Sequence, residues 1–487
     1  MNSMVEVLYN WTKTKPDALC IADLEKDYTY NEIWNETLRI ASALLEMGYN
    51  SGDRIMVECT QDAKFMILAF ACELSHLYFV PIEHKAALER VNDIATDSDA
   101  SVFIHKEDYA SDVKKLSIDE LFAYSPKNII EVNKFPEADE TSEILYTTGT
   151  TGKSKGIEVM NSNNIAIAEN IKCGTEMKEG NIELIPLPLS HSHAIRCAFA
   201  NILNGGAIVL LEGVMRVKLV FELLDKYKAT AMDISPAAAL VLMRLSKGAL
   251  ANYNEQLDYV QIGTAALPEE TKEKLLELLP NVRLYNFYGS TESGRTCVLD
   301  FNSPLKLANC IGKPTVNAKF IITDDDRNEI VSSEENPGLI ATAGPMNMKG
   351  YWKQPELTLK TMHDGFVFTN DLGYINEDGY VFVFGRKDDV INFKGIKIAP
   401  EEIEESARKY SELVDCACVP KADKMSGQVP KLFISVKNKD TFDKEAFYKF
   451  LEDHIDGNKM PKEIEIIDEI PRTYNGKLQR KKLMETN

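Results

Sequence analysis

The sequence lacks the marks of secreted, membrane-spanning and repetitive proteins. No stretch reaches the ~18 consecutive apolar residues that a membrane-spanning helix needs, and the first residues contain no basic segment followed by an apolar one. Neither an internal repeat of ~20–50 residues nor a low-complexity tract is present. We therefore expect a cytoplasmic globular protein with no membrane anchor.

Positive charge is scarce relative to negative charge. The chain contains 55 Lys and Arg against 75 Asp and Glu, which gives a formal net charge of −20. Such a surface repels nucleic-acid phosphates and anionic lipid headgroups, so neither is an expected partner. Any anion that the protein binds must be held by a local group of donors or by a metal ion.

The cysteines do not form a metal-binding pattern. The nine cysteines are scattered along the chain, and Cys416 and Cys418 lack the four-ligand spacing of a zinc site. We expect reduced and mostly buried thiols, as in cytosolic proteins.

The sequence does contain the helix–strand alternation of an α/β protein. Amphipathic segments alternate with short apolar runs over residues 30–105 and again over 183–286, which predicts parallel, doubly wound sheets. From Phe366 onward the elements shorten, with strands expected at 380–384, 414–419, 431–436 and 463–467 and helices near Glu401 and Lys444. A chain of 487 residues also exceeds the ~250–300 residues of a single core. We predict a large N-terminal domain (1–384), a hinge (385–389) and a small α+β C-terminal domain (390–487).

The most unusual segment is a loop rich in glycine, threonine and lysine at residues 146–156. Glycines let backbone N–H groups converge on an anion, while hydroxyls add donors and lysines add charge, so the composition is typical of a phosphate-binding loop. It is not a Walker loop, because only two residues separate Gly149 from Gly152. Apolar runs on both sides predict that the loop joins two strands. A polar hairpin without function is the alternative interpretation.

Together with later segments, this loop resembles the adenylate-forming superfamily of acyl- and aryl-CoA synthetases, luciferase-like enzymes and peptide-synthetase adenylation domains. The resemblance extends from about Tyr30 to Arg480. The later segments that carry it are, in order, 186–191 (PLPLSH), 263–267 (GTAAL), 288–293 (YGSTES), 344–352 (GPMNMKGYW), 369–373 (TNDLG), 385–404 (GRKDDVINFKGIKIAPEEIE) and 471–480 (PRTYNGKLQR). It implies an enzyme that uses ATP and Mg²⁺ to activate a carboxylic acid and then transfers the acyl group to a thiol.

The resemblance also implies a role for individual residues. The triphosphate loop would comprise Thr147, Thr148, Gly149, Thr150, Thr151, Gly152, Lys153 and Lys155. The nucleotide would further be lined by Gly263, Thr264, Ala265, Asn286, Phe287, Tyr288, Gly289 and Ser290. Thr291 would contact the α-phosphate, and Glu292 would hold Mg²⁺, which agrees with the chemistry of a hydroxyl beside a carboxylate.

The resemblance also implies roles for residues of the C-terminal segments. Asp371 would accept hydrogen bonds from the ribose hydroxyls and Arg386 would face the ribose, while Asn370 replaces a common glycine but also tolerates a positive φ. Asp388 would be the hinge residue. Gly395 would lie beside the pantetheine arm of the thiol, and Lys477 would be the catalytic lysine.

In this mechanism the substrate carboxylate attacks the α-phosphorus of ATP and pyrophosphate leaves. A thiol then attacks the carbonyl of the mixed anhydride, and AMP leaves. The resemblance implies that the small C-terminal domain is mobile and rotates between the two steps, which withdraws Lys477.

The resemblance makes His191 a candidate catalytic residue beside the acyl group. The candidates for the acyl pocket itself are His193, Arg196, Cys197, Asp233 and Phe287. Arg196 could pair with a second carboxylate on the substrate, and Asp233 with the ammonium group of an amino acid. Gly289 stands where acetate-specific relatives carry tryptophan, which indicates a deeper pocket, whereas Phe287 would narrow it, so a medium-sized or branched acid is expected.

Two alternatives remain at this stage. The thiol acceptor is either CoA or the phosphopantetheine of a carrier protein, which are chemically alike. A non-catalytic nucleotide-binding relative would be expected to have lost Glu292 or Lys477, and both are present.

Overall fold

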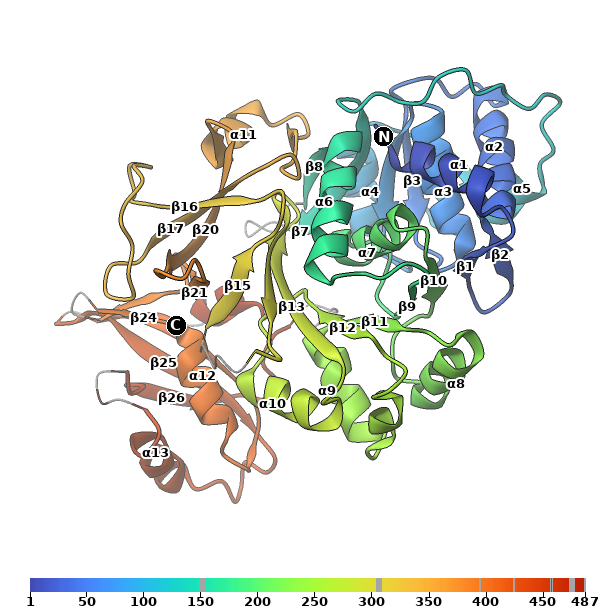
Figure 1. Ribbon diagram of the computed structural model, residues 1–487. Coiled ribbons are helices and arrows are strands. Elements are labelled where there is room, and N and C mark those ends of the chain that lie inside the picture. Colours follow the sequence, from blue (N-terminus) through green and yellow to red (C-terminus); the bar gives the residue numbers. More distant parts are fainter. Residues whose placement is uncertain are drawn as a thin grey trace. The chain divides into compact units, whose positions relative to one another are not determined.

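The structure is a computed structural model that describes residues 1–148, 154–303, 309–393, 396–423, 425–455, 457, 459–472 and 478–485 (Figure 1). It forms two compact units. The first comprises Met1–Leu307, Ile311–Phe320 and Thr342–Val367, and the second comprises Ala308–Cys310, Ile321–Ala341 and Phe368–Asn487. Over the described residues, no helix combines the length and the apolar character needed to cross a membrane.

One sheet of the first unit has the strand order β18-β8-β7-β4-β3-β5-β6. These strands are β3 (Arg54–Glu58), β4 (Tyr78–Ile82), β5 (Ala100–His105), β6 (Lys115–Ser117), β7 (Thr141–Thr148), β8 (Ser154–Met160) and β18 (Gly350–Tyr351). The neighbours β5, β3, β4 and β7 pair in parallel, as the helix–strand alternation predicted. The associated helices are α2 (Tyr30–Glu46), α3 (Ala63–Leu74), α4 (Leu88–Ser98), α5 (Ile118–Ala123) and α6 (Asn161–Gly174).

A second set of strands in the first unit runs in the order β14-β13-β12-β11-β9-β10-β1-β2. They are β1 (Leu19–Ala22), β2 (Asp27–Thr29), β9 (Ile182–Ile185), β10 (Ala207–Leu210), β11 (Ala231–Ile234), β12 (Tyr259–Ile262), β13 (Arg283–Ser290) and β14 (Gly294–Asp300), with β15 (Cys310–Pro314) pairing with β14. The run from β1 through β10, β9, β11 and β12 to β13 is parallel. The remaining elements are α1 (Met4–Thr14), α7 (Ser192–Leu203), α8 (Val217–Tyr227), α9 (Pro236–Leu245), η1 (Ala249–Tyr253), α10 (Glu269–Leu278), α11 (Pro355–Thr361) and β19 (Met362–His363).

The main core of this unit lies where α1, α2, α3, α6 and α7 pack together. Helix α3 is apolar apart from Lys64 and Glu73, and every residue except Lys64 is buried, because a helix of this kind has almost no face that favours water. Helix α2 is amphipathic instead. It begins at a capping box in which Thr29 Oγ1 accepts from Glu32 N while the Glu32 carboxylate accepts from Thr29 N.

The second unit contains two groups of strands. The order β16-β17-β20-β21 joins β16 (Lys319–Thr323), β17 (Gly338–Ala343), β20 (Phe366–Ile375) and β21 (Val381–Arg386). The order β23-β22-β25-β24, with β26 beside β25, joins β22 (Ile391–Phe393), β23 (Ile396–Ile398), β24 (Leu413–Asp423), β25 (Gly427–Val436) and β26 (Glu463–Ile466). The helices are α12 (Pro400–Arg408), α13 (Lys444–Glu452) and α14 (Arg480–Met484). The expected α+β elements are confirmed, while the hinge at 385–389 stays a prediction.

The cysteines behave as expected from the sequence. All nine are free, and all except Cys173 are buried. Burial raises the pKa of Cys416 to about 12, and burial likewise raises the pKa of Cys418. These thiols therefore stay protonated at neutral pH and serve as small apolar side chains.

Candidate active site

The strands beside the predicted triphosphate loop are paired with each other. Strands β7 and β8 are antiparallel, with Thr147 opposite Lys155 and Thr148 opposite Ser154. This confirms the prediction that the loop joins two strands. The five predicted loop residues Gly149, Thr150, Thr151, Gly152 and Lys153 lie outside the described residues.

Glu292 lies close to the base of that hairpin. It occupies the turn between β13 and β14, where Tyr351 Oη donates a hydrogen bond of 2.9 Å to its Oε1 and Met348 N donates one of 2.8 Å to its backbone oxygen. Tyr351 pairs with Ile157 of β8, and Lys155 Nζ lies 5.8 Å from the centre of its ring. Three segments far apart in the sequence thus meet around one carboxylate. The sequence motifs include all three segments, but they assign no role to Tyr351.

The predicted adenine residues lie at the carboxyl ends of neighbouring parallel strands. Ile262 of β12 pairs with Asn286 of β13, and the Asn286 side chain donates a 3.0 Å hydrogen bond to the oxygen of Ile262. Gly263, Thr264 and Ala265 follow directly, and Thr264 has a φ of 78°. Ligands of open α/β sheets bind at such strand ends. A β-branched residue in the left-handed region is strained, and strain of this kind gathers at functional sites.

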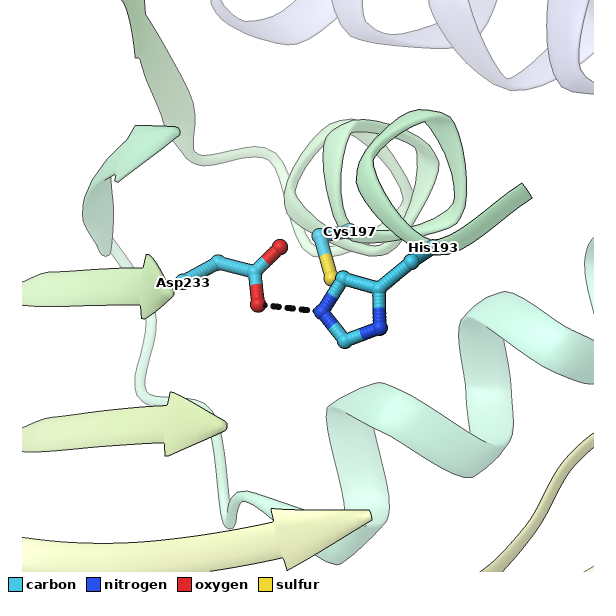
Figure 2. A group of neighbouring side chains, drawn as sticks. All are labelled: His193, Cys197 and Asp233. Atoms are coloured by element: carbon cyan, nitrogen blue, oxygen red, sulfur yellow. Dashed lines mark hydrogen bonds and ion pairs between the residues drawn. The ribbon is translucent and has the colours of Figure 1, made fainter. Parts of the chain in front are cut away.

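His193, Cys197 and Asp233 form a buried group near the same strand ends. Figure 2 shows His193 and Cys197 projecting from α7 toward Asp233, which lies at the end of β11. His193 Nε2 is 2.6 Å from Asp233 Oδ1, and Asp233 is fully buried. Burial, followed by the positive charge of Arg295, lowers the pKa of His193. The imidazole is therefore neutral at pH 7, with Nε2–H donating to the carboxylate and a lone pair on Nδ1.

These three residue types can also bind metal ions, and their ligand atoms lie within 4.8 Å of one another. However, the His193 and Asp233 atoms are at hydrogen-bond distance, 2.6 Å. Two ligands of one tetrahedral ion lie farther apart, at roughly 3.3 Å, because each is ~2.0–2.2 Å from the metal. The group is therefore a hydrogen-bonded network as it stands.

The imidazole of His193 fits because residue 263 is glycine. A Cβ atom at Gly263 would lie 2.2 Å from His193 Cε1. The helix that carries the predicted acyl-pocket residues and the loop predicted to line the adenine are thereby in direct contact. His191 occupies the N-cap position of the same helix, and burial lowers the pKa of its imidazole as well.

Arg196 does not belong to this group of candidates. Its side chain is 1% exposed, and its Nη2 lies 2.5 Å from Glu143 Oε1 on β7. The guanidinium of Arg196 is therefore paired with Glu143, which balances its charge inside the protein and contradicts the expectation that Arg196 meets a substrate carboxylate.

Arg295 was missed by the sequence analysis. It is the second residue of β14, is 6% exposed, and its guanidinium lies 4.9 Å from the centre of the Phe287 ring. Nη2 donates to Cys197 Sγ at 3.2 Å. The sequence feature that could have identified Arg295 is its position within a short run of mostly small and apolar residues, three residues after Glu292.

The interpretation of Gly289 also needs correction. A Cβ at this position would lie 1.8 Å from the backbone oxygen of Gly294, across the β13–β14 hairpin. The backbone contact accounts for the glycine, so its identity does not report the depth of an acyl pocket. Phe287 is buried, and its ring lies against Gly174.

In the second unit, the predicted ribose residues face each other across a strand pair. Asp371 on β20 is opposite Arg386 on β21, and Arg386 Nε is 3.6 Å from Asp371 Oδ1. Asn370 has a φ of 63°, as its replacement of glycine predicted, and its side chain donates a 3.3 Å hydrogen bond to Asp388. The predicted nucleotide and hinge residues of this unit are therefore neighbours. Gly395 and Lys477 lie outside the described residues.

A threonine- and glycine-rich hairpin, a Thr-Glu turn at its base and a small α+β C-terminal region define an adenylate-forming enzyme. The chain belongs to the AMP-binding enzyme family. The family's sequence model matches residues 8–352, and the model of the AMP-binding enzyme C-terminal domain matches residues 402–477. The resemblance stated from the motifs is thereby confirmed.

Curated relatives and solved structures agree with this assignment. The chain is similar to 4-coumarate–CoA ligase 3 of Arabidopsis thaliana (25% identical; 96% of this chain and 87% of that protein). It is also similar to 2-succinylbenzoate–CoA ligase of Oceanobacillus iheyensis (27% identical; 93% of each). The fold is shared with o-succinylbenzoate CoA synthetase of Bacillus subtilis in complex with its acyl-adenylate, with a TM-score of 0.88, 22% identity and coverage of 98% and 97%. The ATP-bound MatB of Rhodopseudomonas palustris also has a TM-score of 0.88, with 22% identity and coverage of 100% and 99%.

Proposed function

We propose that this protein is an AMP-forming acid–CoA ligase. It activates a carboxylic acid as an acyl-adenylate with release of pyrophosphate and then transfers the acyl group to CoA. The observation that carries the proposal is the position of Glu292 at the base of the β7–β8 hairpin, held by Tyr351, in a chain whose relatives over almost its full length are named CoA ligases.

Residues of the first unit hold the phosphates in this proposal. Glu292 offers carboxylate oxygens, the ligand type that Mg²⁺ prefers, and Thr291 offers a hydroxyl to the α-phosphate. Bound Mg²⁺ would neutralise charge on the phosphates. By the resemblance, the hydroxyls and N–H groups of residues 147–155 would bind the pyrophosphate, because this reaction depends mainly on positioning and charge neutralisation.

Residues of the second unit would hold the ribose in this proposal. Asp371 accepts from the ribose hydroxyls, and Arg386, already its neighbour, restrains the carboxylate and adds positive charge. Lys477 contributes charge during adenylation. Rotation about Asp388 then withdraws it, so that the thiol of CoA reaches the acyl carbonyl beside Gly395.

The test is acid-dependent exchange of labelled pyrophosphate into ATP, across fatty, aromatic, dicarboxylic and amino acids. Active acids are then incubated with ATP and either CoA or a carrier protein with its phosphopantetheine. We expect AMP and an acyl-CoA thioester. If only the carrier protein were acylated, the acyl acceptor would be its phosphopantetheine and not CoA. A lack of AMP with every acid would refute the proposal.

A further inference from the structure

Arg295 is a buried cation that has no carboxylate at ion-pair distance among the described residues, although the buried Asp233 belongs to the same group of side chains. Among the described residues, its Nη1 has no hydrogen-bond partner, and its Nη2 contacts only neutral atoms, Cys197 Sγ at 3.2 Å and the backbone oxygen of His193 at 3.5 Å. Arg196 is also buried and its Nη1 also has no hydrogen-bond partner among the described residues, but its Nη2 has Glu143 at 2.5 Å. A buried charge without a partner is costly, so it is retained where a ligand supplies the partner.

The surroundings of Arg295 restrict what that ligand can be. The Phe287 ring covers the guanidinium at 4.9 Å, and Asp233, the buried carboxylate of the group, already accepts from His193. Asp233 Oδ2 has no hydrogen-bond partner among the described residues, but a ligand ammonium that reached it would be repelled by Arg295. An anion instead gains a charge-assisted hydrogen bond from Nη1 of Arg295. The group can therefore receive a second carboxylate.

Arg295 lies close in sequence to the turn at which the reacting carboxylate is expected to bind. In the β13–β14 hairpin it is paired with Gly289, and only Ser293 and Gly294 separate it from Glu292. An acid whose reacting carboxylate lies at the Thr291–Glu292 turn would thus have its far end close to Arg295.

We propose that Arg295 is the specificity-determining residue for the acid, and that the preferred substrates are dicarboxylic acids whose second carboxylate pairs with its guanidinium. This inference rests on the proposed ligase function and names its substrate class. Arg295 acts on substrate choice and does not take part in bond making.

The first experiment measures pyrophosphate exchange with matched straight-chain acids, each monocarboxylic acid against the α,ω-diacid of equal carbon number and against the diacid's neutral monomethyl ester. We expect at least one diacid to exceed both matched compounds in kcat/KM. Arg295→Leu should lower kcat/KM for that diacid by about 10- to 100-fold, the loss of a hydrogen bond to a charged group, and leave the monocarboxylic acid within about 3-fold. Arg244→Leu, an identical change at an exposed arginine of α9, is the matched control and should change neither.

A second measurement is independent of ligase activity. The preferred diacid, without ATP, should raise the melting temperature of the wild-type protein and of Arg244→Leu but not of Arg295→Leu. Arg295→Leu without ligand should melt at or above the wild-type temperature, because leucine removes an unpaired buried charge. If no acid supports exchange while diacids still stabilise the wild type, the ligase proposal fails and the binding assignment stands. Equal rates for diacids and monoacids, or equal losses for both in Arg295→Leu, would overturn the assignment.

Discussion

At the scale of single residues, we expect adenylation to depend most on Glu292. Replacing it by glutamine keeps a hydrogen-bond acceptor for Tyr351 but removes the negative charge proposed to bind Mg²⁺. We expect Glu292→Gln to lower pyrophosphate exchange by at least about 100-fold. Glu277→Gln, at an exposed position of α10, is the matched control and should retain full activity. Activity of Glu292→Gln within a few-fold of wild type would exclude the proposed role.

A second residue, Glu183, makes stability depend on pH. It is fully buried on β9 and accepts from Gln261 Nε2 at 2.6 Å and Tyr259 Oη at 3.1 Å. Burial, followed by the negative charge of Asp233, raises its pKa to about 8. The folded protein therefore keeps this proton up to about pH 8, whereas the unfolded chain releases it near the ordinary value of 4.5.

It follows that the contribution of Glu183 to stability is fully present below about pH 4.5 and is lost as the pH rises to about 8. We expect the difference in unfolding free energy between wild type and Glu183→Gln to shift in favour of the variant between pH 5 and pH 8. Urea unfolding at several pH values measures this difference. A difference that stays constant with pH would contradict the assignment.

At the scale of elements, the pair Arg196–Glu143 joins α7 to β7 inside the protein. Removing one partner leaves the other as an unpaired buried charge, so Arg196→Met and Glu143→Leu should each cost about 3–5 kcal/mol of unfolding free energy. The double variant should recover most of that loss. Urea unfolding of the cycle tests this, with Lys218→Met in the exposed Lys218–Glu222 pair of α8 as a control that costs less than about 0.5 kcal/mol. Additive losses in the double variant would show that the two charges do not interact.

Elements were easier to predict from the sequence than the directions of their side chains. The apolar runs correctly predicted β3, β4 and β5 and the strand pair around the triphosphate loop, because burial of short strands leaves a local pattern. Arg196 and Arg295 could not be assigned in the same way. Whether a buried arginine has a carboxylate beside it depends on strands distant in sequence, such as β7 for Arg196. The spacing of residues along the chain therefore does not predict such contacts.

At the scale of the whole molecule, the two half-reactions should depend on different residues. Asp388→Pro fixes φ at the predicted hinge, so we expect normal adenylation and at least about 10-fold slower thioester formation. Lys477→Ala should do the reverse, with a large loss in adenylation and little effect on transfer from preformed acyl-adenylate. Pyrophosphate exchange and single-turnover thioester formation measure the two steps separately. Equal slowing of both steps in Asp388→Pro would place the hinge elsewhere.

The contact between His193 and Gly263 limits how such an enzyme can diverge. Even a single methyl group at position 263 would collide with the imidazole and drive it away from Asp233. Directed evolution toward new acids should therefore recover changes at 193 and 263 only as pairs, whereas position 295 can change by itself. In the proposed assignment, this one ring couples the loop that lines the nucleotide base to the helix that lines the acid.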